Sequence, residues 1–375
     1  MDLRLPRTDR PRSRQARHAQ LAVPFVLIAV VTVVDVLAPP EVHLGPFLVA
    51  APAVTASFAG PRMTGFVGLV AVLAQVVVSV VRTSLTDLNH TFQITALIMI
   101  SVIVTLFAHL REVHEKEVIQ LRSVAETAQQ VVLRPLRERI GPLRVASVYL
   151  AAAAEARIGG DLYAAARTAT ATRLIIGDVR GKGLEAVGDA ALALGAFRAA
   201  AHQESDLPRL VAYLEGAVAP DLDDPQDRGE SFITAAVLEI PDREPALHLV
   251  SCGHPPPLLL RDGRAVPLVV DHPAPPLGLA GLLDSALAPE SFGFAVGDVL
   301  LLYTDGVLEA RDASGAFFPL EERAAARSGA EPRTLLERLC ADLLAHAADN
   351  TLGDDAAMVA IERLPGPPDG PTRSH

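Results

Sequence analysis

Residues 157–183 read RIGGDLYAAARTATATRLIIGDVRGKG and place two aspartates in similar surroundings. Asp161 follows two glycines, and Asp178 follows Gly177 at the end of the apolar run Leu174–Ile176. A short apolar run bounded by glycine is typical of a β-strand that ends in a turn. The stretch therefore predicts two carboxylates at strand ends, within the length of one hairpin.

Two later segments repeat this arrangement. In DVLLLYTDGVLEA (298–310), Asp305 and a glycine follow an apolar strand, and in TLGDDAAMVAIER (351–363), Asp354 and Asp355 precede the last strand. Carboxylates in one folded domain repel each other unless a positive charge lies among them. Oxygen ligands without histidine or cysteine favour hard cations such as Mg²⁺ or Mn²⁺. Each motif alone is more typical of a surface turn, so the combination carries the prediction.

That combination resembles the PPM family of metal-dependent serine/threonine phosphatases, and within it the bacterial SpoIIE-type branch. The stretches that carry the resemblance are IGGDLY, IIGDVRGKGLEA, LVSCGHPPPLLL, LLLYTDGVLEARD and GDDAAMVAIER, which together cover residues 145–364. The resemblance implies an α+β fold, a two-layer antiparallel β-sandwich flanked by helices, with two divalent cations in the cleft between the sheets.

The resemblance also implies which residues hold these cations. Asp161, Asp178, Asp305 and Asp354 would act in catalysis through the metal ions and a water that they activate, with the backbone carbonyl of Val179 as a further ligand. The implied reaction is hydrolysis of phosphoserine or phosphothreonine on a regulatory protein, an anti-anti-sigma (STAS-domain) factor. Either Mn²⁺ or Mg²⁺ would serve.

One position departs from the family pattern. The family places another aspartate after GGD-x-Y, where this chain has Ala164. We expect altered metal affinity or activity from this change. The alternative is a catalytically inactive PPM domain that acts as a membrane-tethered docking module.

Three further residues are auxiliary candidates. Asp355 neighbours a predicted ligand, Arg157 could contact a substrate phosphate, and His254 in CGHPPPLL could act as an acid or base. A rigid proline-rich loop after His254 favours a structural role for it. Cys252 and Cys340 stand in no metal-binding spacing, so we expect two small core residues.

The first third of the chain is apolar enough for a membrane. Half of all residues are apolar, only 4% are aromatic and the mean hydropathy is +0.32. Four apolar segments are each about long enough to cross a bilayer: 21–38, 44–60, 63–81 and 92–110. Asp35, near the end of the first, is interpreted as an interfacial residue.

Flanking charges predict the orientation. Six arginines precede the first segment and Arg62 lies between the second and third, whereas the first and third connections carry few charges of mixed sign. The positive-inside rule then places the N-terminus and the C-terminal domain in the cytoplasm, at the inner membrane. The formal net charge of −11 gives no support for nucleic-acid binding, and no basic stripe follows the first twenty residues.

A connecting helix follows the apolar segments. Val118, Leu121, Ala125, Ala128 and Val132 recur in steps of three and four, which predicts either a parallel homodimeric coiled coil or a helix packed on the next domain. The expected organisation is a basic N-terminus (1–20), a membrane region of four helices (21–110), the connecting helix (111–135), the phosphatase-like domain (145–364) and a disordered tail (365–375).

Within that domain, strands and helices alternate. The expected strands are Val145–Ala152, Arg173–Gly177, Phe232–Ile240, Ala246–Cys252, Leu258–Leu260, Val299–Tyr303 and Ala357–Ile361, with helices at Leu184–Ala201 and Arg333–Ala347.

Overall fold

The computed structural model describes residues 14–39, 44–81, 88–152, 160–219, 232–279 and 287–365. The chain forms two compact units, one of Leu5–Leu121 and one built from Arg122 onward. The boundary falls inside the predicted connecting helix.

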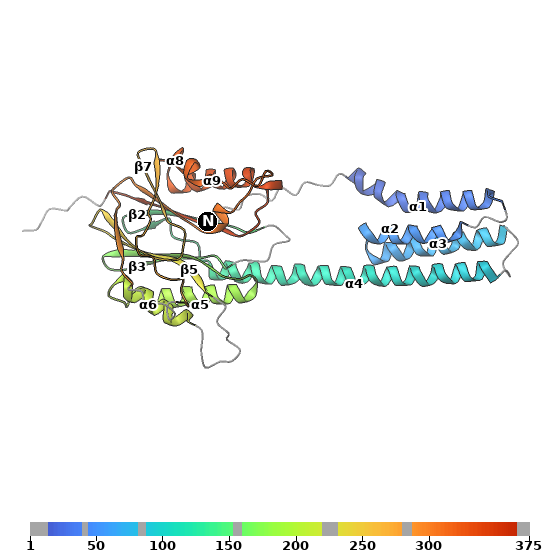
Figure 1. The fold of residues 1–375 in the computed structure, drawn as a ribbon, viewed down its shortest axis with the longest axis horizontal. Coiled ribbons are helices and arrows are strands. Elements are labelled where there is room, and N and C mark those ends of the chain that lie inside the picture. The colour runs from blue at the N-terminus through green and yellow to red at the C-terminus, as the bar shows by residue number, and fades with distance from the viewer. Residues whose placement is uncertain are drawn as a thin grey trace, which may run out of the picture. The chain divides into compact units, whose positions relative to one another are not determined.

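The N-terminal unit consists of helices at all four predicted apolar segments (Figure 1). They are α1 (Arg14–Leu37), the 3₁₀ turn η1 (Gly45–Val49) that leads into α2 (Ala50–Phe58), α3 (Pro61–Val81) and α4 (Leu88–Val132). Helix α1 begins at Arg14, within the basic segment expected at residues 1–20. Helix α4 unites the fourth apolar segment and the connecting helix in 45 residues. The predicted coiled-coil seam of α4, from Val118 to Val132, falls on residues whose side chains are outside the described part of the structure.

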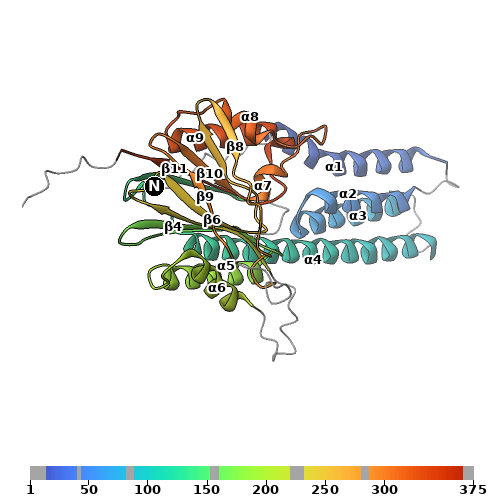
Figure 2. The same ribbon diagram turned by 60° about the vertical axis from the view of Figure 1, so that its left-hand side comes forward.

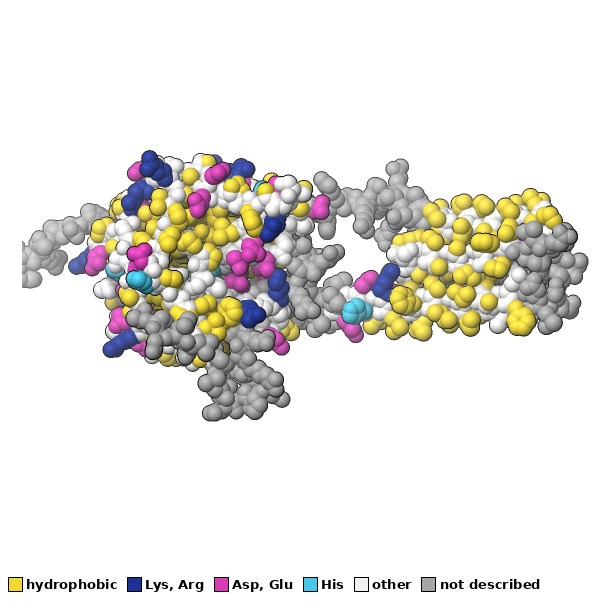
Figure 3. All heavy atoms as spheres, in the orientation of Figure 1, with side chains coloured by type: hydrophobic (Ala, Val, Ile, Leu, Met, Phe, Trp, Pro, Cys, Tyr) yellow, Lys and Arg dark blue, Asp and Glu magenta, His cyan; other side chains and the backbone are white. Residues whose placement is uncertain are grey.

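Two helices in the described residues are long and apolar enough to cross a membrane, Pro61–Val81 and Thr91–Glu117. The apolar helices Ala22–Leu37 and Gly45–Phe58 are shorter. The exterior of this unit is covered by large apolar side chains (Figure 3), including Val30, Phe47, Phe66, Leu73, Val77, Met99, Val102, Ile103, Leu106 and Phe107, which are all more than half exposed.

Several polar side chains of this unit lie inside it. Gln75 is 1% exposed and donates a hydrogen bond from Nε2 to Oε1 of Gln93 at 3.0 Å. Asp35, near the end of α1, is 3% exposed. Its Oδ1 accepts a hydrogen bond from the backbone N–H of Leu44 at 3.0 Å, which compensates the burial of the carboxylate.

The C-terminal unit is a sandwich of two antiparallel sheets (Figure 2). One sheet has the order β1-β2-β11-β10-β7-β8 and the other β3-β4-β5-β6-β9. The first sheet contains β1 (Arg139–Ile140), β2 (Leu143–Leu150), β11 (Ala356–Arg363), β10 (Val299–Tyr303), β7 (Leu258–Arg261) and β8 (Arg264–Pro267). The second contains β3 (Leu162–Arg167), β4 (Ala171–Val179), β5 (Ile233–Pro241), β6 (Ala246–Cys252) and β9 (Glu290–Gly293).

Helices cover the outer face of each sheet. Helices α5 (Leu184–Ala200) and α6 (Leu207–Val218) contact the second sheet, and α8 (Leu320–Ala325) and α9 (Pro332–His346) contact the first. Helix α7 (Asp305–Leu308) is a single turn after β10, and η3 (Ala348–Asn350) precedes β11. This arrangement confirms the predicted α+β sandwich.

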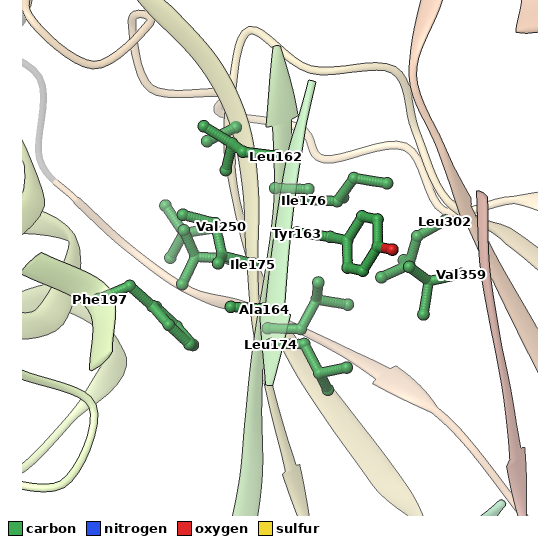
Figure 4. Close-up of a cluster of buried hydrophobic side chains, with 14 of the residues drawn as sticks. Leu162, Tyr163, Ala164, Leu174, Ile175, Ile176, Phe197, Val250, Leu302 and Val359 are labelled. Atoms are coloured by element: carbon green, nitrogen blue, oxygen red, sulfur yellow. The ribbon is translucent and has the colours of Figure 1, made fainter. Parts of the chain in front are cut away.

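The core lies in three layers, one between the sheets and one beneath each helix pair. Side chains alternate between the two faces of β3 and β4, so these strands contribute to two of the layers (Figure 4). Ala164 and Ile175 point toward Phe197 of α5, whereas Tyr163 points toward Leu302 of β10. Both cysteines are buried in the core, as predicted.

The seven predicted strands and both predicted helices are present, with bounds shifted by at most a few residues. Strand β3 was missed because its sequence LYAAAR is rich in alanine, which has low strand propensity. Helix α6 was missed as well, although its Asp206 accepts a capping hydrogen bond from Arg209 N–H at 2.9 Å.

Candidate active site

Asp161 and Asp178 lie opposite each other at the open end of the β3–β4 hairpin. The register pairs Leu162 with Gly177, so the two aspartates come one step further along the same antiparallel ladder. The backbone N–H of Val179 donates to the carbonyl of Gly160 at 3.3 Å and continues the ladder past both of them.

Both carboxylates face the space between the sheets. Side chains alternate along a strand, so Asp161 shares the face of Tyr163 and Asp178 shares the face of Ile176. Tyr163 and Ile176 point toward the opposite sheet (Figure 4). The hairpin therefore directs its two acidic residues to one place, the end of the cleft between the sheets.

The glycines next to these aspartates are required because neighbouring chain segments approach their backbone closely. A Cβ at Gly160 would lie 2.4 Å from Cβ of Val179, and one at Gly177 would lie 2.4 Å from the carbonyl oxygen of Thr234. At Gly306 the added atom would lie 1.9 Å from the carbonyl oxygen of Asp355. No side chain fits at these positions, which explains why glycine accompanies the aspartates.

The opposite sheet brings Asp305 and Asp354 to the same end of the cleft. Strands β10 and β11 pair Tyr303 with Met358, so the residues after β10 lie beside those before β11. Asp305 begins α7 directly beyond β10, and Asp354 stands two residues before β11. Acidic side chains gather on this face of the unit (Figure 3).

Electrostatic coupling shows that these carboxylates are close together. Burial raises the pKa of Asp178 from 3.8 to about 7, with Asp305 and Asp354 adding to the effect. Burial and the charge of Asp178 raise the pKa of Asp161 well above its ordinary value. The pKa of Asp305 is raised by burial, then by Glu309 and Asp354. Such a group retains protons unless a cation enters, and grouped raised pKa values are typical of functional sites.

The geometry of the sandwich agrees with the sequence comparison. Residues 168–364, more than half of the chain, match the family described as Stage II sporulation protein E (SpoIIE). The chain belongs to the SpoIIE family. Asp178, Asp305 and Asp354 of this SpoIIE-type PPM phosphatase domain lie inside the matched segment, and Asp161 precedes it.

Solved structures share the fold of this SpoIIE-family chain. The SiaA-PP2C domain of Pseudomonas aeruginosa superposes with a TM-score of 0.54 at 17% identity, over 67% of this chain and 98% of that one. The RsbU and RsbW domains of a Mycobacterium tuberculosis protein give a TM-score of 0.51 at 24% identity, over 62% of this chain. The match spans 64% of the length of the mycobacterial structure.

Thr304 is a site residue that the sequence reasoning missed. It is fully buried, and its Oγ1 donates to Oδ2 of Asp161 at 2.8 Å. The same oxygen accepts from the backbone N–H of Ala357 at 2.9 Å. Thr304 therefore connects the two sheets at the acidic cluster. A polar residue next to a predicted ligand in YTDG was the only sequence signal for it.

His254 is held between both sheets in its neutral form. Its Nε2 lies 3.1 Å from the carbonyl oxygen of Tyr303, which can only accept, so Nε2 carries the proton. Its Nδ1 then accepts from Oγ1 of Thr234, at 3.1 Å. Burial lowers the pKa of His254 to about 4. Its contacts fit the predicted structural role.

Ala164 lies on the helix side of β3, away from the cleft. It is 4% exposed and pairs with Ile175, on the layer that contains Phe197 (Figure 4). The departure from the family pattern therefore falls in an apolar layer and not among the carboxylates.

The remaining candidates differ in their position. Asp355 is 3% exposed and its Oδ1 accepts from the backbone N–H of Ala152 at 2.7 Å, so it connects β2 to β11. Val179 ends β4 beside Asp178. Arg157 lies outside the described residues.

The donors fit hard cations. In the described part of the chain, no group of three or more Asp, Glu, His or Cys side chains lies close enough together to hold a metal ion. The fit therefore rests on the type of donor, since carboxylate oxygens suit a hard cation that keeps several of its waters, as Mg²⁺ does.

Proposed function

We propose that this SpoIIE-family chain is a membrane-anchored protein serine/threonine phosphatase that acts through two divalent cations. The observation that carries this proposal is the convergence of Asp161 and Asp178 from one sheet with Asp305 and Asp354 from the other. Strongly raised pKa values at Asp161 and Asp178 support it, because such carboxylates gain most from a bound cation.

The side chains of Asp161, Asp178, Asp305 and Asp354 would hold the two cations, with the Val179 carbonyl as a further ligand. Mg²⁺ or Mn²⁺ would activate a water and neutralise charge on the phosphoryl group. Thr304 orients the Asp161 carboxylate by its hydrogen bond. His254 stays neutral and supports the strand ends, so it takes no part in proton transfer.

The substrate that we propose is phosphoserine or phosphothreonine on a regulatory protein, an anti-anti-sigma factor with a STAS domain. Family membership and the fold shared with an RsbU domain support this class of substrate. An open cluster of carboxylates at the end of a cleft is also accessible to a residue carried on another folded protein.

The N-terminal helices would anchor the enzyme in the cytoplasmic membrane. Two of them satisfy the length and apolarity of a membrane span, and the apolar exterior of the unit with polar side chains inside supports all four as a membrane bundle. The arginines before the first apolar segment favour a cytoplasmic phosphatase domain. Pairing of two chains through the C-terminal part of α4 would give a homodimer.

Hydrolysis of a phosphoserine peptide by the full-length protein in detergent, with and without Mn²⁺, tests this proposal. We expect turnover that requires the metal and that Asp178→Asn abolishes. A matched variant, Asp206→Asn, changes an exposed helix cap outside the cleft and should retain turnover. Absence of both turnover and metal binding in the unmodified protein would favour a docking module without catalysis.

A further inference from the structure

Lys182 forms an ion pair with Asp354 across the end of the cleft. Its Nζ lies 2.7 Å from Oδ2 of Asp354, and the two side chains are 40% and 39% exposed. Lys182 belongs to the turn between β4 and α5, whereas Asp354 precedes β11 in the opposite sheet. The contact therefore joins one sheet's glycine-rich turn to the other sheet's carboxylate.

The turn that carries Lys182 is held by few other contacts. Arg180 is anchored, since its backbone N–H donates to the carbonyl of Phe232 at 2.8 Å. Gly181 and Gly183 have φ values of +117° and +93°, and a Cβ at either would find no neighbour within 4 Å. Packing does not fix this part of the turn, so the ion pair is a principal contact that determines where the ammonium group lies.

We propose that Lys182 is a built-in competitor of the divalent cation at Asp354 and so lowers the metal affinity of this site. The inference rests on the proposed function, in which Asp354 is a metal ligand. An ammonium group that donates to Oδ2 occupies an acceptor that the cation needs. Positive charge at this distance also opposes a second cation directly.

Arg180 is the other positively charged side chain of this turn, and it does not share this role. The guanidinium of Arg180 lies over the ring of Phe232, 5.2 Å from its centroid. Arg180 and Lys182 carry the same charge on the same turn, two residues apart. A comparison of the two therefore separates a specific contact from the general effect of removing one positive charge.

The test measures Mn²⁺ binding to the full-length protein in detergent by titration calorimetry. Lys182→Met should bind the more weakly held ion about 3- to 10-fold more tightly than the unmodified protein. Arg180→Met should change the affinity by less than about twofold, because exposed charges at longer range are screened. Unchanged or weaker binding in Lys182→Met, or equal tightening in Arg180→Met, would overturn the proposal.

A double-mutant cycle with Asp354→Asn assigns the effect to the pair. If Lys182 acts through Asp354, Lys182→Met should have no effect on Mn²⁺ affinity once Asp354 is neutralised. An equal effect in both backgrounds would contradict the competition. Absence of Mn²⁺ binding in the unmodified protein would overturn the metal site itself, whereas binding that Lys182→Met leaves unchanged would overturn only this inference.

Discussion

Thr304 donates a hydrogen bond to Asp161 across the cleft, over 2.8 Å, from the end of one sheet to the start of a strand in the other. Its hydroxyl oxygen also accepts from Ala357 N–H. A single buried side chain thus determines how a predicted metal ligand is oriented and how the two sheets meet. Thr304 is as much a part of the site as the aspartates are.

Replacing Thr304 by valine should destabilise the protein and weaken metal binding. The substitution keeps the shape of the side chain but leaves Asp161 and the Ala357 N–H without this buried partner, which costs about 1–3 kcal/mol in the free energy of unfolding. Thermal unfolding followed by circular dichroism, with and without Mn²⁺, measures both effects. Thr304→Ser keeps the hydroxyl and should behave like the unmodified protein. A valine variant as stable as the serine variant would contradict this role.

Neutralising Asp178 should stabilise the protein in the presence of a chelator, increasingly so as the pH rises. The pKa of Asp178 is raised in the folded state from 3.8 to about 7, so the folded state binds this proton more tightly than the unfolded state does. The stabilisation that this tightly bound proton provides is therefore present below pH 3.8 and is lost as the pH rises to about 7. Asp178→Asn removes that loss and should gain about 1–3 kcal/mol at neutral pH.

The measurement compares the thermal midpoints of Asp178→Asn and the unmodified protein across this pH range. The difference should widen toward neutral pH, and groups that do not interact with Asp178, such as His254, cancel in it. Mn²⁺ should then stabilise the unmodified protein more than the variant. A difference independent of pH would show that Asp178 does not titrate in this range.

Gly306→Ala should prevent the normal approach of α7 to β11. The added Cβ would lie 1.9 Å from the carbonyl oxygen of Asp355, which is backbone and has little freedom to move. We expect a loss of about 3 kcal/mol or more in the free energy of unfolding. Gly195→Ala provides the control, because Gly195 lies inside α5 with open space around it. That change should stabilise the protein by about 0.5–1 kcal/mol.

His254→Gln should lower stability without changing the pH dependence of turnover. The neutral ring joins Tyr303 and Thr234, so its loss weakens the contact between the sheets. Burial holds the pKa of His254 at about 4, and a group that remains neutral from pH 5 upward cannot shape a profile there. Full pH profiles of phosphopeptide hydrolysis check this. A shifted acidic or basic limb in the variant would identify His254 as a proton carrier.

Local patterns in the sequence were sufficient for most of the strands and for placing Asp178, Asp305 and Asp354 near strand ends. The apolar runs at Ala246–Cys252 and Val299–Tyr303 became strands with the predicted bounds. They could be predicted because strand propensity and turn residues act over a few neighbouring positions. The same holds for the apolar helices of the N-terminal unit, whose length and composition are properties of single segments.

Only the tertiary structure decided which contacts complete the site. Thr304 with Asp161, His254 with Thr234 and Tyr303, and Lys182 with Asp354 all join residues that are distant in the chain. Such partners follow from how two sheets pack, and no local periodicity encodes them. The face occupied by Ala164 was decided in the same way, since a strand rich in alanine has no apolar alternation that would distinguish its two sides. The sequence alone determined which carboxylates stand at strand ends; the packing of one sheet on the other brought them together, because only that packing joins chain segments so far apart.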